Sequence, residues 1–462
     1  MFSRISHAFV RPLWEGQKSL QRLQLRTLLS CSNLTEVKLE IFSEVLKETQ
    51  SHCSPAGSDS NRAKLMEILP QSQELLPPRR MSDSLLHALI PIGSNPEVQL
   101  KYVSSVGGAR LGRLLQDMDY FAAVVVYKHI VNPLQTDGQG LSAHSVVTAR
   151  MDHVNLKQSI KEDLDVVLVG HVTWVGNSSA EVGVRLDQLE KDGSRSNVLE
   201  ARFVMVSRDA ATGTRSAPLN PLVTETLEEH YIFSQGKENI GRRAKAMQDS
   251  LFFQPPSQEE NELIHKMFLS TIDHKERSFS ARIKPKNSNW MGDSKLKSVM
   301  LCEPEHKNDY NVVFGGLIME KCVDLACINT YKYCKSAHVP VCTQIDDVVF
   351  LKSVNIGDLL FFHSQVVFTH ENKIQTRVSA EIMDKDTHKL KLTNVLQLTF
   401  ELPSVVPSVI PMSYHEAMAY LTGRRHFLLG LEKSGILEEG MATKLALEVR
   451  FFFIMAIDFD MI

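Results

Sequence analysis

The sequence predicts an α+β protein of two tandem domains, each an antiparallel sheet of about five strands wrapped around a long central helix. Three observations carry this prediction. A glycine-opened helix occurs twice, at Gly112 and at Gly316, and each copy has a carboxylate about two turns in. Several apolar, β-branched runs follow each helix. The 462 residues exceed what one core accommodates and suit two domains with extensions.

The first half begins with a strand candidate at Glu97–Val103 and a helix predicted from Gly112 to Val131. The helix sequence is apolar on every face from Tyr120 to Tyr127, which predicts a helix buried all round. Turn signals such as Gly176-Asn177 divide the strands that follow, as an antiparallel meander requires. These strand candidates are Val166–Val175, Ala180–Leu186 and Ala201–Val206.

The second half repeats this order, which indicates an internal duplication. A shift of 195 residues superposes Asp152 on Asp347 and continues into the long strands, whereas the helices need a shift of 204. An inserted loop at Asn132–Gly140 in the first half explains the difference. The strand candidates here are Ser298–Cys302, Val341–Phe350, Leu359–Thr369, Lys373–Ile382 and Leu392–Leu402.

The N-terminal region has the composition of a mitochondrial transit peptide, rich in arginine, serine and leucine with Glu15 as its one acid before residue 35. A disordered basic tail is the alternative. The matrix is the predicted compartment, and no run is long enough for stable membrane insertion. The predicted parts are a transit peptide at 1–35, domains at 80–220 and 271–405, a linker at 221–270 and a C-terminal extension at 406–462.

The composition argues against several classes of protein. With 51 basic and 54 acidic side chains, no sequence-wide basic surface favours nucleic acid. The seven cysteines have no CxxC pair and are interpreted as reduced core thiols, so no metal site is expected. The sequence lacks a GxSxG elbow, a Walker loop and an HExxH motif, and Gly138-Gln139-Gly140 lacks the rest of a dinucleotide fingerprint. No cofactor is therefore predicted.

The segment from His306 to Gly316, with an asparagine loop before a Gly-Gly helix and Asp324 on that helix, resembles the hotdog-fold acyl-CoA thioesterases. The runs Ile345–Phe350 and Asn355–Leu360 resemble the strands that follow in this family. The resemblance covers roughly residues 80 to 430. It implies hydrolysis of fatty acyl-CoA to free fatty acid and coenzyme A, and a homo-oligomer that is a trimer of double-hotdog chains.

Residue chemistry fits such hydrolysis. Backbone N–H groups at a helix start that begins with glycine can bind an oxyanion. Gly315 and Gly316 are therefore predicted to bind the oxyanion or substrate, and Gly112 is the corresponding residue of the first half. A carboxylate in an apolar helix gains basicity through desolvation and can act as base or nucleophile. Asp119 lies seven residues past Gly112, roughly 10 Å along the axis, so one carbonyl is not expected to contact both. A site composed from both halves is therefore predicted.

Spacing predicts one working and one degenerate site. The family acid sits seven residues past the second glycine and faces an asparagine of the partner domain, which matches Asp119 with Asn308. Asp324 lies eight residues past Gly316, and Ser104 stands where the first half would need an asparagine. In the site prediction Asp119, Asn308 and Asp324 are catalytic, with Asp119 as the base or nucleophile.

Simpler interpretations remain for these residues. Asp119 could be an exposed helix carboxylate, although Asp117 fits that role better because Arg113 can pair with it. Asp324 could belong to a solvated stripe with Glu320, and Asn308 could only cap its loop. Two other functions stay open: a hotdog hydratase or dehydratase, which needs a histidine such as His306 opposite the acid, and a non-catalytic acyl-CoA-binding protein.

Overall fold

The computed structural model describes residues 40–42, 44, 67–105, 107–130, 142–152, 154–273, 275, 279–280, 282–308, 312–346, 348–384 and 387–433. The expected transit peptide, the inserted loop at 132–140 and residues 441–462 lie outside these described residues.

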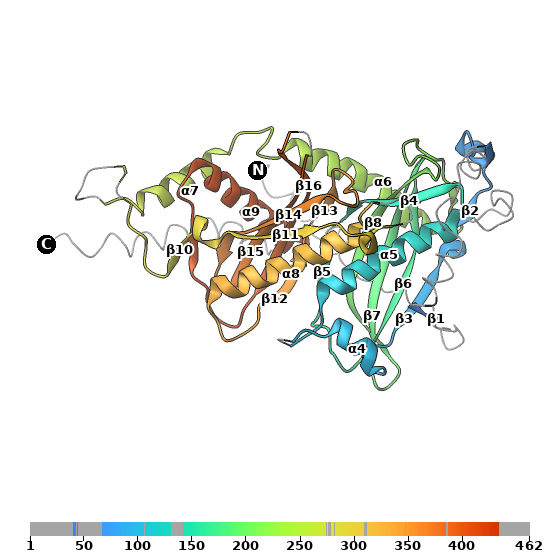
Figure 1. Ribbon diagram of the computed structural model, residues 1–462, viewed down its shortest axis with the longest axis horizontal. Helices are drawn as coiled ribbons and strands as arrows, with labels where there is room; N and C mark the ends of the chain where they lie inside the picture. Colours follow the sequence, from blue (N-terminus) through green and yellow to red (C-terminus); the bar gives the residue numbers. More distant parts are fainter. Residues whose placement is uncertain are drawn as a thin grey trace, which may run out of the picture.

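One thirteen-stranded sheet runs through the described part of the chain, in the order β1-β3-β6-β7-β8-β4-β13-β16-β15-β14-β11, with β5 and β12 beside the centre (Figure 1). The first half supplies β1 (Glu40–Ile41), β3 (Leu86–Ile90), β4 (His144–Met151), β5 (Val154–Leu156), β6 (Asp165–Val175), β7 (Ser179–Leu189) and β8 (Arg195–Asp209). The second supplies β11 (Leu296–Leu301), β12 (Val341–Ile345), β13 (Val348–Phe350), β14 (Leu359–His370), β15 (Lys373–Met383) and β16 (Leu390–Glu401).

The two halves meet at the middle of the sheet, where antiparallel pairing of β4 with β13 joins Met151 to Val348. The first half has the strand order β3-β6-β7-β8-β4, and the second half has the matching order β11-β14-β15-β16-β13, when each is read from the outer end of the sheet toward its centre. Each half holds one long helix, α5 (Leu111–Ile130) or α8 (Gly315–Cys334), against its strands. This is the predicted tandem hotdog architecture, so the predicted fold class is confirmed.

The helices α5 and α8 pack against each other antiparallel, and their glycines permit the close approach. A Cβ at Gly112 would lie 2.9 Å from the Glu320 carbonyl oxygen, and one at Gly316 would lie 2.9 Å from the Gln116 Cα. Real Cβ atoms do not tolerate such contacts with backbone atoms. Both glycines are therefore required for helix packing, independently of any role in chemistry.

A second helix of each half lies on the other face of the sheet. Gly170 of β6 faces Phe121 of α5, and the bulge after Val172 turns Trp174 to the opposite face. There, Gly236 of α6 (Leu227–Gln248) lies so close that an added Cβ would stand 2.4 Å from the Trp174 Cβ. In the second half α9 (Tyr414–Lys433) packs likewise, with Gly423 against Val367.

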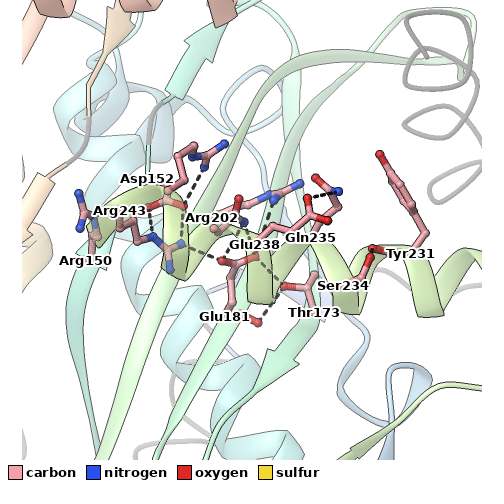
Figure 2. Close-up of polar contacts among 12 residues, drawn as sticks. Arg150, Asp152, Thr173, Glu181, Arg202, Tyr231, Ser234, Gln235, Glu238 and Arg243 are labelled. Atoms are coloured by element: carbon pink, nitrogen blue, oxygen red, sulfur yellow. Dashed lines mark hydrogen bonds and ion pairs between the residues drawn. The ribbon is translucent and has the colours of Figure 1, made fainter. Parts of the chain in front are cut away.

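Ion pairs fix α6 to this face, as Figure 2 shows. Arg243 donates from Nε to Asp152 at 3.0 Å and from Nη2 to Glu181 at 2.8 Å. Both carboxylates are buried, so each needs these partners. The second half uses the equivalent aspartate, Asp346, which pairs with His426 of α9.

The strand pairing corrects the predicted register by one residue. Asp152 and Asp346 both donate their backbone N–H to the neighbouring long strand, so Asp152 corresponds to Asp346 and not to Asp347. The shift is 194 residues there, whereas the helices keep the predicted 204, because α5 and α8 have equal lengths of 20 residues and start at 111 and 315.

The strand expected at Glu97–Val103 is wrong, because this segment forms helix α4 (Pro96–Tyr102). Asn95 caps it by accepting from the N–H groups of Glu97 and Val98, and Pro96 occupies the first helical position. The remaining described elements are α7 (Gln258–Leu269), the short strands β2 (Arg79–Arg80), β9 (Leu222–Val223), β10 (Ser288–Trp290) and β17 (Ser408–Ile410), and the 3-10 turns η2 (Gln73–Leu75), η3 (Ser82–Ser84), η4 (Met291–Ser294) and η5 (Pro304–His306).

No helix in the described residues has the length and apolarity to cross a membrane. The five cysteines in that part of the chain, at 302, 322, 327, 334 and 342, are free thiols.

Candidate active site

Asp119 is fully buried and lies where the first half meets the start of the second half's helix. Its Oδ1 accepts a hydrogen bond from the Thr148 hydroxyl of β4 at 2.6 Å. The Gly316 N–H of α8 stabilises the charged form of this carboxylate, and Oδ2 has no hydrogen-bond partner among the described residues. A Cβ at Gly315 would lie 3.5 Å from Asp119 Oδ2, which places that oxygen at the first turn of α8. The structure thus brings Asp119 together with Gly315 and Gly316 across the two halves.

Burial is the dominant influence on this carboxylate and raises the pKa of Asp119 to about 7. The Thr148 hydroxyl and the Gly316 N–H oppose that rise because they stabilise the charged form. A carboxyl group with a pKa near 7 exchanges protons readily at neutral pH, which suits a general base.

A cavity of about 1160 Å³ has walls from both halves, and these include Thr148 and Gly315, which lie next to the Asp119 carboxylate. Asp119 itself lies behind these two residues and is not among those that line the cavity. Thr148 and Ala123 line it from the first half, and Asn308, Gly315 and Phe350 line it from the second. Asn308 stands in the turn before α8, where its Oδ1 accepts from the Val312 N–H at 3.3 Å. The predicted partners of Asp119 therefore border one cavity. Their catalytic roles stay predictions.

The pseudo-equivalent position in the second half has a different chemistry. Val323, which is buried, is the counterpart of Asp119 at the helix shift of 204. Thr148 and Cys342 are counterparts because each lies directly before a bulge in the pairing of its strand. Asp324 sits one residue further and pairs with Arg110 at 3.6 Å. Burial raises the pKa of Asp324, and the Arg110 charge opposes this rise.

Other residues weighed in the sequence have structural roles. Asp117 is buried and not exposed as expected, because α4 packs near its helix, although its predicted pairing with Arg113 is present at 3.5 Å. Glu320 is buried and bonds Arg110 at 2.7 Å, so the solvated stripe is wrong for that residue. His306 accepts the Glu303 N–H and is not among the residues that line the cavity.

Thr148 is the site residue that the sequence interpretation missed. Nothing in its spacing marks it, since it is one of several β-branched residues in a strand. Its role depends on which face of β4 meets α5, and this is set by the sheet. No cluster of three or more histidine, cysteine, aspartate or glutamate side chains that could hold a metal occurs in the described residues.

The fold and the site define a double-hotdog protein whose two halves bury the Asp119 carboxylate between them. A scan against protein-family models finds no match. The mitochondrial acyl-coenzyme A thioesterase 9 of Mus musculus is 41% identical over 367 residues, covering 79% of this chain and 82% of that protein. The Homo sapiens protein of the same name is also 41% identical over the same shares. The mitochondrial acyl-coenzyme A thioesterase 4 of Humulus lupulus is 29% identical.

This chain therefore belongs to the acyl-coenzyme A thioesterase family and is a thioester hydrolase. The resemblance inferred from the sequence, to acyl-coenzyme A thioesterase 9 in particular, is confirmed. Among solved structures, an acyl-CoA hydrolase from Staphylococcus aureus in complex with butyryl coenzyme A is 24% identical, covers 35% of this chain and 97% of that one, and has a TM-score of 0.30.

Proposed function

We propose that this chain hydrolyses fatty acyl-CoA to free fatty acid and coenzyme A at the site between its halves, with Asp119 as base or nucleophile. One observation carries this proposal: a fully buried carboxylate with a pKa of about 7 lies directly behind Thr148 and Gly315 in the wall of a cavity formed by both halves. A desolvated carboxylate next to a helix start is the pairing that thioester hydrolysis needs.

In the base mechanism, Asp119 takes a proton from a water molecule while the water oxygen attacks the thioester carbonyl carbon. The resulting oxyanion lies at the start of α8, where Gly315 lines the cavity and its N–H can donate. The carbon–sulfur bond then breaks, and the proton held by Asp119 passes to the coenzyme A thiolate. In the nucleophile mechanism, Asp119 itself attacks the carbonyl carbon, and the carbon–sulfur bond breaks to release the coenzyme A thiolate. Water then cleaves the resulting anhydride to free fatty acid and protonated Asp119, which gives its proton to the thiolate.

Asn308 is assigned the positioning of the water or the carbonyl group, because it lines the same cavity as Gly315. The Gly316 N–H is given a different role from the one expected, since it stabilises the charged Asp119 carboxylate. Asp324 and Gly112 are assigned to a degenerate site, because Arg110 already pairs with Asp324.

Steady-state release of thiol from acyl-CoA tests this proposal. Asp119→Asn keeps the shape but removes the base, and a loss of about 100-fold or more in kcat is expected. Asp324→Asn is the matched control on the other helix and should keep most of the activity. Wild-type protein without turnover would support a non-catalytic acyl-CoA-binding protein and overturn the hydrolase assignment. Full turnover by Asp119→Asn would overturn the site.

A hydratase or dehydratase is the alternative enzyme, and it predicts turnover of an enoyl-CoA or hydroxyacyl-CoA without thiol release. The structure supplies little for it, because His306 is engaged in a turn with Glu303. Observed hydration with no thiol release would favour this alternative over hydrolysis.

We further propose a mitochondrial matrix location and a trimer of double-hotdog chains. The relatives named mitochondrial and the basic N-terminal composition support the location. Edge strand β11, with Val299 and Leu301 exposed, supports association. Light scattering would give the mass of three chains if the trimer exists, and the mass of one chain would refute it. Fractionation that leaves the protein outside mitochondria would refute the location.

A further inference from the structure

The loop after β8 is held by one buried carboxylate, Asp209, the last residue of that strand. Its side chain accepts hydrogen bonds from the Thr212 hydroxyl at 2.9 Å and from the Arg215 N–H at 2.8 Å. It also accepts from the Thr212 N–H. Gly213 takes a positive φ of 68°, which its lack of a side chain permits. These hydrogen bonds to the buried Asp209 carboxylate thus hold the loop 210–214 in one conformation.

Burial alone would raise the pKa of Asp209, yet the hydrogen bonds from the Thr212 and Arg215 N–H groups outweigh it and hold the pKa below its usual value. The carboxylate therefore stays charged at neutral pH, and its hydrogen bonds to the loop do not depend on pH in the physiological range.

The opposite side of this loop faces the cavity of the candidate site. Residues 210–214 all line it, and Arg208 lines it beside them. From the second half Lys307 and Lys352 line the same cavity, and both lysines are exposed to solvent there. Three cations and a loop of small residues thus border the cavity whose other walls include Thr148 and Gly315.

The second half has no such loop at the equivalent place, after β16, which separates this feature from the sheet architecture that the two halves share. Strand β16 ends at Glu401 and continues as Leu402-Pro403-Ser404, with no aspartate before Tyr414. Of the two equivalent places, the one after β8 has the loop anchored by an aspartate, and the buried acid Asp119 lies near the same cavity.

We propose that Asp209 is a positioning residue: it holds the loop 210–214 in the conformation that binds the phosphate groups at the coenzyme A end of the substrate. Arg208, Lys307 and Lys352 supply the charge that these phosphates need. This inference rests on the proposed acyl-CoA hydrolysis at the same cavity. Because a preformed loop need not become ordered when the substrate binds, Asp209 should affect the affinity for acyl-CoA and not the chemical step.

The test compares acyl-CoA with the same acyl group on pantetheine, which has no nucleotide and no phosphate. Asp209→Asn should raise KM for acyl-CoA about tenfold, with a much smaller change in kcat, because the loop loses its charged anchor. KM for acyl-pantetheine should change by less than about twofold. Asp384→Asn is the matched control, since Asp384 holds Thr387 through the same two kinds of hydrogen bond in the hairpin between β15 and β16.

Equal changes in KM for both substrates, or no change for either, would overturn the loop assignment. If Asp209→Asn does not fold, Lys352→Gln gives the same comparison, because it removes one of the three charges and leaves the hydrogen bonds of Asp209 and Arg208 to the loop in place. Wild-type protein that releases no thiol from either substrate would instead refute the proposed function. The two failures are therefore distinguishable.

Discussion

Replacing Thr148 with valine should move the pH profile of the enzyme while preserving its shape. The Thr148 hydroxyl donates to Asp119 Oδ1 at 2.6 Å and stabilises the charged carboxylate, whose pKa is about 7. A hydrogen bond to a charged group contributes about 1.5–3 kcal/mol. Since one pKa unit corresponds to about 1.4 kcal/mol, its loss should raise the pKa of Asp119 by about one to two units.

The consequence for rate follows from the ionised fraction. Near pH 7 about half of Asp119 is ionised in the wild type. After a rise of one to two units that fraction is about a tenth to a hundredth, so kcat/KM at pH 7 should fall roughly 5- to 50-fold. Activity should recover as the pH rises toward 9, because the carboxylate then ionises again.

The assay is thiol release from acyl-CoA measured across pH 6 to 10. Cys342→Val is the matched control, because Cys342 holds the equivalent strand position in the half with Val323 in place of the acid. Its profile should superpose on that of the wild type. An unshifted inflection in Thr148→Val, or a uniform loss at every pH, would refute the assignment of Asp119 as the titrating base.

Three further outcomes are expected. Asp324→Asn should lower the unfolding free energy by less than about 1 kcal/mol, measured by urea titration, since its ion pair with Arg110 is partly exposed; a larger loss would contradict this. Burial lowers the pKa of His144 to about 4, so stability should fall as pH drops from 6.5 toward 4, by about 3 kcal/mol from this residue, and His144→Gln should flatten that slope. Gly236→Ala should lower the melting temperature because its Cβ would meet Trp174 at 2.4 Å, whereas Gly241→Ala, with open space around it on the same helix, should raise it slightly.

The helix copies were the part of the site that the sequence could predict. Helical spacing is rigid, so seven residues after Gly112 and eight after Gly316 place Asp119 and Asp324 on different sides of their helices. The structure accordingly puts Val323 at the position equivalent to Asp119.

Sheet contacts were harder to predict because they join distant residues. Thr148 reaches Asp119 only through the way β4 packs on α5, and no local pattern records that contact. A shared signal was present elsewhere: Ser84 and Ser294 end similar Met-x-Asp-Ser segments, and each accepts a strand N–H, from Val172 and Val366. The two serines are 210 residues apart, so this pair marks the duplication but does not give the strand shift of 194.

The local sequence contains enough signals to predict helices α4 and α6, although α4 was interpreted as a strand and α6 as part of a linker. Asn95-Pro96 is a helix start, yet the apolar residues that follow suggested a strand. Thr226 and Glu229 form a capping box that opens α6 within the segment interpreted as a linker. The domain limits themselves stay predictions.

The claim that the two halves form one working site per chain is tested most directly by counting ligands. Calorimetric titration with a thioether analogue of acyl-CoA, which cannot be hydrolysed, gives the number of sites. One molecule should bind per chain, because Arg110 pairs with Asp324 and the second half lacks an equivalent of the Asp209 loop after β16. Two equivalent molecules per chain would contradict it.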